Sequence, residues 1–130
     1  MSEKAFIYRV DGTTELVEFE VGKSLSLLQS AVEGYVQPIS LAPSLDMWVN
    51  ENYIAEGLSL NVLGSIFYHE NFNQDAPILG NIIFTGGTDS EGETLGLGAK
   101  EIDYLFSCAK TAEPMLRAWE AHKAERGITE

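Results

Sequence analysis

The sequence predicts an α+β fold in one domain: a mainly antiparallel sheet that starts with an N-terminal β-hairpin, packs against helices and precedes a helical C-terminal tail. The chain has 130 residues, 45% of them hydrophobic, which suits one buried core and is too short for two. Apolar residues alternate near the N-terminus, as in strands, and recur at helical spacing from Ala99 onward. Only 22% of residues are charged, too few for a disordered chain.

Residues 5–21 are typical of a β-hairpin followed by a helix. Asp11-Gly12 predicts the turn, because glycine accepts the positive φ of a tight turn. Ser24 then offers a side-chain oxygen that would cap a helix, and Gly34 suits the left-handed position that would end it. The alternating residues are Phe6, Tyr8 and Val10, then Val17, Phe19 and Val21, and the helical stripe is Leu25, Leu28 and Val32.

The middle of the chain has a less regular pattern. Residues 35–41 are predicted to be extended, with Pro38 marking an edge or irregular strand, and residues 47–49 form a short strand. Residues 58–68 are compatible with a helix that starts near Ser59 or Asn61, or with a strand.

The C-terminal half is predicted as a loop, a buried strand, a glycine-rich connection and a helix. The loop covers 69–77, the strand 78–84 and the connection 86–98, part of which could pair back as a short strand. Pro114 should interrupt the helix that begins at Ala99, or start a second helix.

This proline divides the predicted chain into an α+β domain, residues 1–113, and a C-terminal helix, residues 114–130. The second helix has a narrow apolar stripe, so we expect it to dock on the domain or to form a homo-oligomer. The candidate interface residues are Met115, Leu116 and Trp119.

Charge is the most unusual property of the sequence. The net charge is −12, and no Lys or Arg lies between Lys23 and Lys100. Such a field disfavours direct binding of nucleic acid and favours a basic partner, although the same charge could serve solubility alone. The candidate acidic surface is Glu56, Asp89, Glu91 and Glu93.

The sequence shows no set of residues that would carry catalysis. Cys108 is the only cysteine, which excludes an internal disulfide, and its place on a helix favours a buried thiol. The two histidines lack recognisable partners, and the alternating acids near Asp89 lack the spacing of a calcium loop. We therefore expect no enzyme activity, no cofactor and no metal.

Some residues are suited to binding a ligand or a partner. Trp48 stands beside hydrogen-bonding side chains, as a ring-binding site requires, although the pattern favours a tryptophan partly buried against the sheet. Gly86-Gly87 could present N–H groups to a phosphate or simply form a turn. The candidate binding residues are Tyr35, Trp48, Asn50, Glu51, Asn61, Gly86 and Gly87.

Residues 25–98 resemble a family of mostly phage-borne proteins, domain of unknown function 3846. The resemblance rests on Gly34-Tyr35-Val36, Val49-Asn50-Glu51, Asn61, residues 79–83 and Gly86. The chain has Asn81 where the family commonly has Asp, and Asn52 where it has Glu. The family supplies no catalytic role for these positions, and the resemblance implies a phage accessory protein inside a bacterial host.

Three functional hypotheses follow. The first is a non-catalytic phage binding protein that acts on a host component, plausibly an anti-defence factor, through an acidic surface. The second is a sponge that sequesters a nucleotide signal, and the third is a hydrolase that uses acidic residues. No apolar run approaches the roughly 20 residues of a membrane helix, and the N-terminus lacks a signal core, so we expect a cytoplasmic protein.

Overall fold

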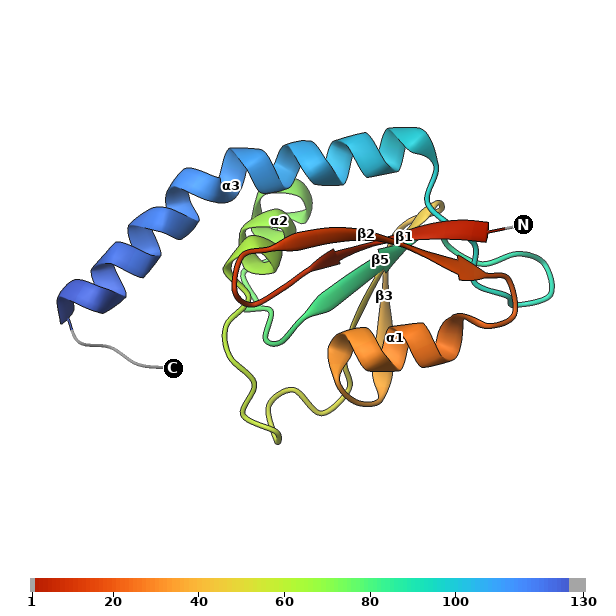
Figure 1. Ribbon diagram of the computed structural model, residues 1–130, viewed down its shortest axis with the longest axis horizontal. Coiled ribbons are helices and arrows are strands. Elements are labelled where there is room, and N and C mark those ends of the chain that lie inside the picture. Colours follow the sequence, from red (N-terminus) through yellow and green to blue (C-terminus); the bar gives the residue numbers. More distant parts are fainter. Residues whose placement is uncertain (1, 127–130) are drawn as a thin grey trace.

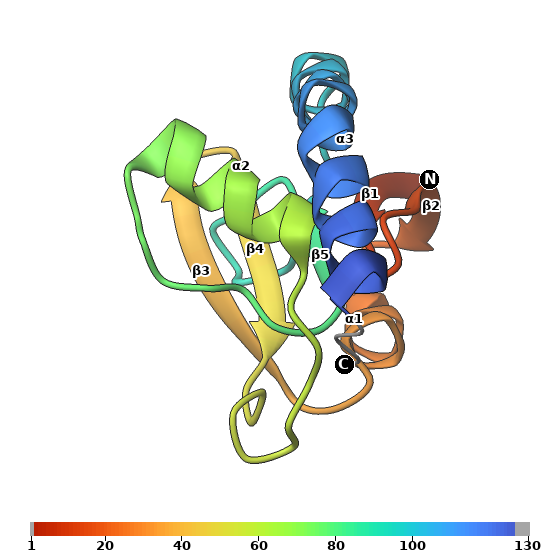
Figure 2. The ribbon, with the colours of Figure 1, turned by 90° about the vertical axis from the view of Figure 1, so that its left-hand side faces the viewer.

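The computed structural model describes residues 2–126, which form a five-stranded antiparallel sheet with helices on both faces (Figures 1 and 2). This confirms the predicted α+β class with its N-terminal hairpin. The strands are β1 Ser2–Tyr8, β2 Thr14–Glu20, β3 Val36–Ala42, β4 Leu45–Asn50 and β5 Ile82–Thr85. The helices of the described part are α1 Ser24–Val32, α2 Val62–Phe72 and α3 Ala99–Arg126.

The strand order is β2-β1-β5-β4-β3, so the last strand of the sequence is the middle strand of the sheet. β5 joins two hairpins: it pairs with β1 through Ile7 and Ile83, and with β4 through Met47 and Phe84. Pro38 lies on β3, the edge strand, as predicted, because an edge position does not need its missing N–H.

Each face of the sheet has its own core. On one face, α1 covers a small core that includes Phe19, Leu28 and Ile83. On the other face, α2 and α3 lie side by side (Figure 2) and cover a larger core rich in aromatic rings, among them Tyr8 and Phe67. Alternation along β1 explains the division, since Ala5 and Ile7 belong to the first core and Phe6 and Tyr8 to the second.

The ends of α1 differ from the prediction. Lys23 occupies the N-cap position without a side-chain cap bond, and Ser24 is the first helical residue. At the other end Glu33 takes the left-handed conformation, with φ 61°. Gly34 is required for another reason: a Cβ at this position would lie 2.6 Å from Asn50 Nδ2. The contact with Asn50 therefore requires glycine at position 34, and the left-handed residue is Glu33, one position earlier.

The ambiguous segment after residue 58 is a helix. α2 starts after Asn61, whose side chain accepts a hydrogen bond from Gly64 N. The helix continues to Phe72, so the predicted loop at 69–77 begins four residues too early. Gly64 lies within this helix, and a Cβ there would lie 2.8 Å from Ile82 Cδ1. Close packing of the helix on β5 therefore explains the glycine.

The prediction that Pro114 ends a helix is wrong. α3 runs through it without a break, and the boundary between residues 113 and 114 lies inside one helix. Proline lacks the N–H that would bond the carbonyl of Lys110, and Figure 1 shows α3 bent near its middle, with its second half turned away from the first. Residues 127–130 of the predicted C-terminal helix lie outside the described residues.

Candidate functional site

Four of the sequence-predicted residues meet at one end of the sheet, where the chain leaves β4. Tyr35 precedes β3, Asn50 ends β4, and Glu51 and Glu56 belong to the loop that follows. The backbone N–H of Glu51 donates to the carbonyl oxygen of Tyr35 at 2.8 Å, so the two segments are joined. In Figures 1 and 2 this loop projects beyond the sheet. We call Glu33, Tyr35, Glu51, Ile54 and Glu56 the acidic end surface.

Asn50 builds this end of the molecule from within. It is fully buried, and its Nδ2 donates to the carbonyl oxygen of Val32 at 3.2 Å and to Glu56 Oε1 at 3.5 Å. Its Oδ1 accepts from the backbone N–H of Asn52 at 2.7 Å. Asn50 thus ties the loop to the end of α1, and it acts as a structural residue that leaves Tyr35 and Glu51 at the surface.

The acidic end surface combines apolar exposure with negative charge. Ile54 is 74% exposed and Tyr35 67%, the highest values among the large apolar side chains of the described residues. None of the ion pairs found in residues 2–126 includes Glu33, Glu51 or Glu56. Exposed apolar groups ringed by charge of one sign are typical of a contact surface for a partner of the opposite sign.

The other predicted binding residues lie elsewhere and have structural contacts. Trp48 packs against the core under α1, and its Nε1 donates to Thr85 Oγ1 at 2.8 Å. Asn61 is fully buried and its Nδ2 donates to the carbonyl oxygens of Tyr8 and Gly80. The fold therefore does not bring Trp48 or Asn61 to the acidic end surface.

The Gly86-Gly87 pair serves close packing of the backbone. A Cβ on Gly86 would overlap the carbonyl oxygen of Gly96, and Gly87 has φ +98°. The N–H of Gly86 donates to the carbonyl oxygen of Leu95, and that of Leu95 donates to Gly87. The segment pairs back only through an isolated bridge between Thr88 and Thr94, and it does not form the short strand that the sequence suggested.

The predicted acidic surface is divided between the two ends of α1. Glu56 lies beside Gly34 after this helix, whereas Glu93 lies beside Gly22 before it. Asp89 Oδ1 accepts the backbone N–H groups of Glu91 and Glu93, which makes a compact polar turn. Glu56 and the Asp89–Glu93 turn are consequently two separate acidic regions.

The predicted interface residues of the C-terminal helix also separate. Leu116 packs on the larger core, close enough to Gly12 that a Cβ there would overlap it. Met115 is 55% exposed and lines a pocket between α2 and α3. Trp119 lies outside both cores, with its ring stacked on His122. Docking on the chain's own core thus accounts for Leu116.

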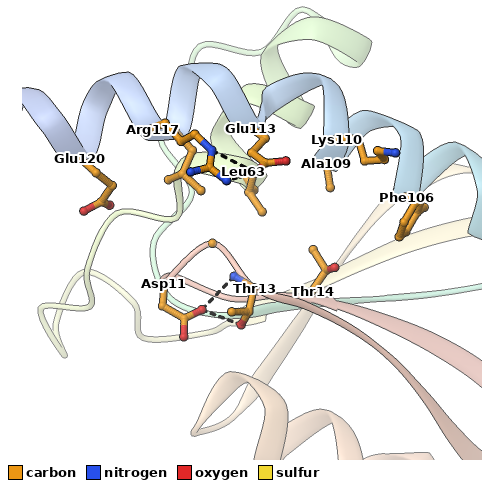
Figure 3. A pocket seen from close by; sticks show the side chains of 12 residues that line it. Asp11, Thr13, Thr14, Leu63, Phe106, Ala109, Lys110, Glu113, Arg117 and Glu120 are labelled. Atoms are coloured by element: carbon orange, nitrogen blue, oxygen red, sulfur yellow. Dashed lines mark hydrogen bonds and ion pairs between the residues drawn. The ribbon is translucent and has the colours of Figure 1, made fainter.

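A groove that sequence reasoning missed lies between the β1–β2 turn and α3 (Figure 3). It has a volume of about 540 Å³. Figure 3 shows Phe106 and Ala109 pointing from α3 toward the turn, with Thr13 and Thr14 on the opposite wall. We call it the hairpin–helix groove. Its charged residues come from both walls and include Asp11, Lys110, Glu113 and Arg117.

The pocket between α2 and α3, which Met115 lines, has a volume of about 450 Å³ and is also lined by Cys108. Asn71 Nδ2 lies 3.8 Å from its Sγ, and the hydroxyl of Tyr104 donates to Asn71 Oδ1. Burial raises the pKa of the Cys108 thiol, which keeps it protonated and weakly nucleophilic. The half-buried thiol agrees with the packing role expected for it.

The family comparison matches residues 4–109 to "Domain of unknown function (DUF3846)". The chain belongs to this family. The DUF3846 match extends beyond residues 25–98 at both ends; it includes nearly all of the first hairpin and the beginning of α3. No curated protein and no solved structure matches the chain significantly. The acidic end surface lies inside the DUF3846 segment, whereas most of the α3 wall of the hairpin–helix groove follows it.

Two classes of site have no support in the described residues. No group of three or more His, Cys, Asp or Glu side chains in the described part is arranged to hold a metal ion. Within the same residues, none of the helices combines the length and the apolar character that crossing a membrane requires.

Proposed function

We propose that this DUF3846 protein is a non-catalytic binding protein that captures a partner protein with a basic surface through the acidic end surface. The exposure of Tyr35 and Ile54, in segments that also carry three carboxylates for which residues 2–126 show no ion pair, carries the proposal. Aromatic and aliphatic side chains dominate binding energy at interfaces, and surrounding charge selects and orients the partner. The absence of Lys and Arg between residues 23 and 100 extends the negative field over this end.

The family resemblance suggests the biological setting. A phage accessory protein acting on a host component, as an anti-defence factor in the host cytoplasm, fits a small acidic binding protein. This setting is an analogy at the level of the family, and the identity of the captured protein decides it.

The experiment is affinity capture from host lysate with matched charge variants. The test variant is Glu33→Gln/Glu51→Gln/Glu56→Gln, and the control is Glu70→Gln/Asp75→Asn/Glu91→Gln, which removes the same charge from other exposed positions. We expect wild type and control to retain one partner that the test variant loses. Capture should weaken between about 0.1 M and 1 M salt, because the Debye length falls from about 10 Å to about 3 Å.

Equal capture by the test variant and the control would reject the acidic end surface as the contact. Tyr35→Ala and Ile54→Ala then separate the apolar part of the contact from the charge, since neither changes the net charge. Multiple turnover of any substrate by the purified protein would overturn the non-catalytic function and favour the acidic hydrolase.

A second candidate function, a sponge for a nucleotide signal, has one observation in its favour. Asn50 and Asn61, which the sequence suggested as binding residues, are fully buried, and their burial counts against this function. However, Arg9 and Lys123 line one pocket together, although they lie at opposite ends of the chain. Cations that converge from distant segments are what a phosphate group requires.

A further inference from the structure

A pocket of about 440 Å³ lies where the second half of α3 passes the β1–β2 turn. We call it the α3-end pocket. It adjoins the hairpin–helix groove, with which it shares Asp11 and Glu120. Its volume falls in the range of about 300–1,000 Å³ that small-molecule sites occupy.

Lys123 is the first observation that points to a ligand. Its side chain is only 17% exposed, although it lies near the end of the described helix. Its Nζ lies 3.5 Å from Glu120 Oε1 and 5.9 Å from the centroid of the Trp119 ring. The contacts given for the ammonium group are thus one carboxylate at a long distance and one aromatic ring, which leaves N–H donors for a further acceptor. An anion in the pocket would complete its surroundings.

Arg9 supplies a second cation from a different element. Its Nη2 donates to Glu15 Oε1 at 2.5 Å, which orients the guanidinium. In the described contacts this is the only side-chain hydrogen bond of Arg9, and a guanidinium carries five N–H donors in a planar fork. Two cations that approach from the turn and from α3 are suited to hold one phosphate between them.

Trp119 supplies one face of its ring for stacking, since His122 stacks on the other. It lines the α3-end pocket and belongs to neither core, so core packing does not explain its place. Nucleic acid bases stack on aromatic side chains in many single-strand binding sites, because every base has a π-face.

Asp11 and Glu120 lie at the junction with the groove. Asp11 Oδ1 already accepts from Thr13. Glu120 Oε1 faces Lys123. The second oxygen of each carboxylate is therefore the acceptor that suits the N–H donors on the edge of a guanine.

We propose that the α3-end pocket binds a guanine nucleotide, with its phosphate held by Arg9 and Lys123 and its base stacked on Trp119. The pocket adjoins the acidic end surface through Asn81, which lines it and donates from Nδ2 to Glu33 Oε2 at 3.3 Å. The proposal rests on the second candidate function, to which it gives a location. Its α3 residues follow residue 109, where the DUF3846 match ends. Nucleotide binding here is therefore a property of this chain's extended helix.

Calorimetric titration of the wild-type protein with GMP, guanosine and inorganic phosphate tests the proposal. We expect GMP to bind at least about tenfold more tightly than guanosine or phosphate alone, because it engages the cations and the indole together. Lys123→Gln and Arg9→Gln should each weaken GMP binding by about tenfold or more. Lys110→Gln, on the same helix but outside the pocket, is the matched control and should bind as wild type does.

Tryptophan fluorescence gives an independent readout. In Trp48→Phe, Trp119 is the only tryptophan, and GMP should quench it; in Trp119→Phe, Trp48 should not respond. No GMP binding at millimolar concentration would overturn the site, and the sponge would fall only if other nucleotides also failed to bind. GMP binding that survives both Arg9→Gln and Lys123→Gln would overturn the site and leave the sponge standing.

Discussion

Asn61 shows how a single polar side chain can hold three segments together. It is fully buried, accepts the N–H of Gly64 at the start of α2, and donates to carbonyl oxygens of Tyr8 in β1 and Gly80 before β5. All three bonds lie within 2.8–3.0 Å. The polarity that made Asn61 a plausible ligand residue in the sequence is consumed by the fold itself.

Asn61→Ala should destabilise the protein by about 3 kcal/mol or more. The substitution removes the N-cap of α2 and leaves two buried carbonyl groups without this donor. Urea unfolding followed by circular dichroism measures the change. Asn71→Ala, at an exposed position, is the control and should cost below about 1 kcal/mol. Similar losses for the two variants would contradict the structural role of Asn61.

Tyr8 offers a pH-dependent test of the aromatic core. Its side chain is buried and its hydroxyl donates to the carbonyl oxygen of Leu105. Burial above all, with Cys108 and Tyr104 adding to it, raises the pKa of Tyr8 above its usual range. The folded state therefore binds this proton more tightly than the unfolded state, whose tyrosine ionises near pH 10. The contribution of protonated Tyr8 to the free energy of unfolding is complete below pH 10 and decreases as the pH rises above 10.

Tyr8→Phe should be less stable than wild type at pH 7, by about 1–2 kcal/mol, because Leu105 loses its hydrogen-bond donor. The difference in the free energy of unfolding between the two proteins should narrow by about 1.4 kcal/mol by pH 11. Ionisation of Tyr8 stabilises the unfolded state of wild type, and the variant has no such group. Guanidinium unfolding at a series of pH values measures both. Parallel stability curves for the two proteins would show that Tyr8 ionises as easily in the folded state.

Helix α3 shows where sequence patterns and tertiary packing disagree. Proline predicts a helix end because it lacks an N–H, yet Ala112 and Leu116, on either side of Pro114, both pack on the same core. The stripe in fact crosses Pro114 with alternating spacings of three and four residues, through 102, 105, 109, 112, 116 and 119. That continuous spacing indicates one helix. The packing of Ala112 and Leu116 on the core outweighs the backbone hydrogen bond that Pro114 cannot donate.

Leu116 and Met115 form a matched pair for testing how α3 is held. Leu116→Ala should cost about 2–3 kcal/mol, because Leu116 packs on the core against the β1–β2 turn. Met115→Ala, at a side chain that is 55% exposed, should cost well under that. Thermal unfolding measures stability, and light scattering measures mass. A loss of dimer mass on Leu116→Ala without loss of stability would instead make Leu116 an oligomer contact.

At the scale of the whole molecule, the sequence predicted the class of fold better than the site. Alternation and turn residues report local structure, so the hairpin and its glycine turn followed directly from them. The acidic end surface was partly foreseen through Tyr35, Glu51 and Glu56, since each is polar or aromatic beside a turn. The α3-end pocket was not, because only folding brings Arg9 to Lys123.

The net charge of −12 should make stability depend on salt. Self-repulsion between like charges opposes the compact state, and salt screens it. Raising NaCl from about 0.1 M to about 1 M should therefore increase the melting temperature. Glu51→Gln/Glu56→Gln/Glu70→Gln/Glu91→Gln, which removes four exposed charges, should show a smaller increase. An equal increase in melting temperature for this variant and for wild type would show that the effect is general salting-out.

The position of β5 in the middle of the sheet determines when the sheet can be completed during synthesis. Two hairpins, β1–β2 and β3–β4, are synthesised before β5, and until β5 is available each has an unpaired edge exposed to solvent. An isolated hairpin is marginally stable in water, so neither can complete a core alone. The sheet cannot close until Thr85, the last residue of β5, has left the exit tunnel. During that interval both hairpin edges are accessible to chaperones and to neighbouring chains.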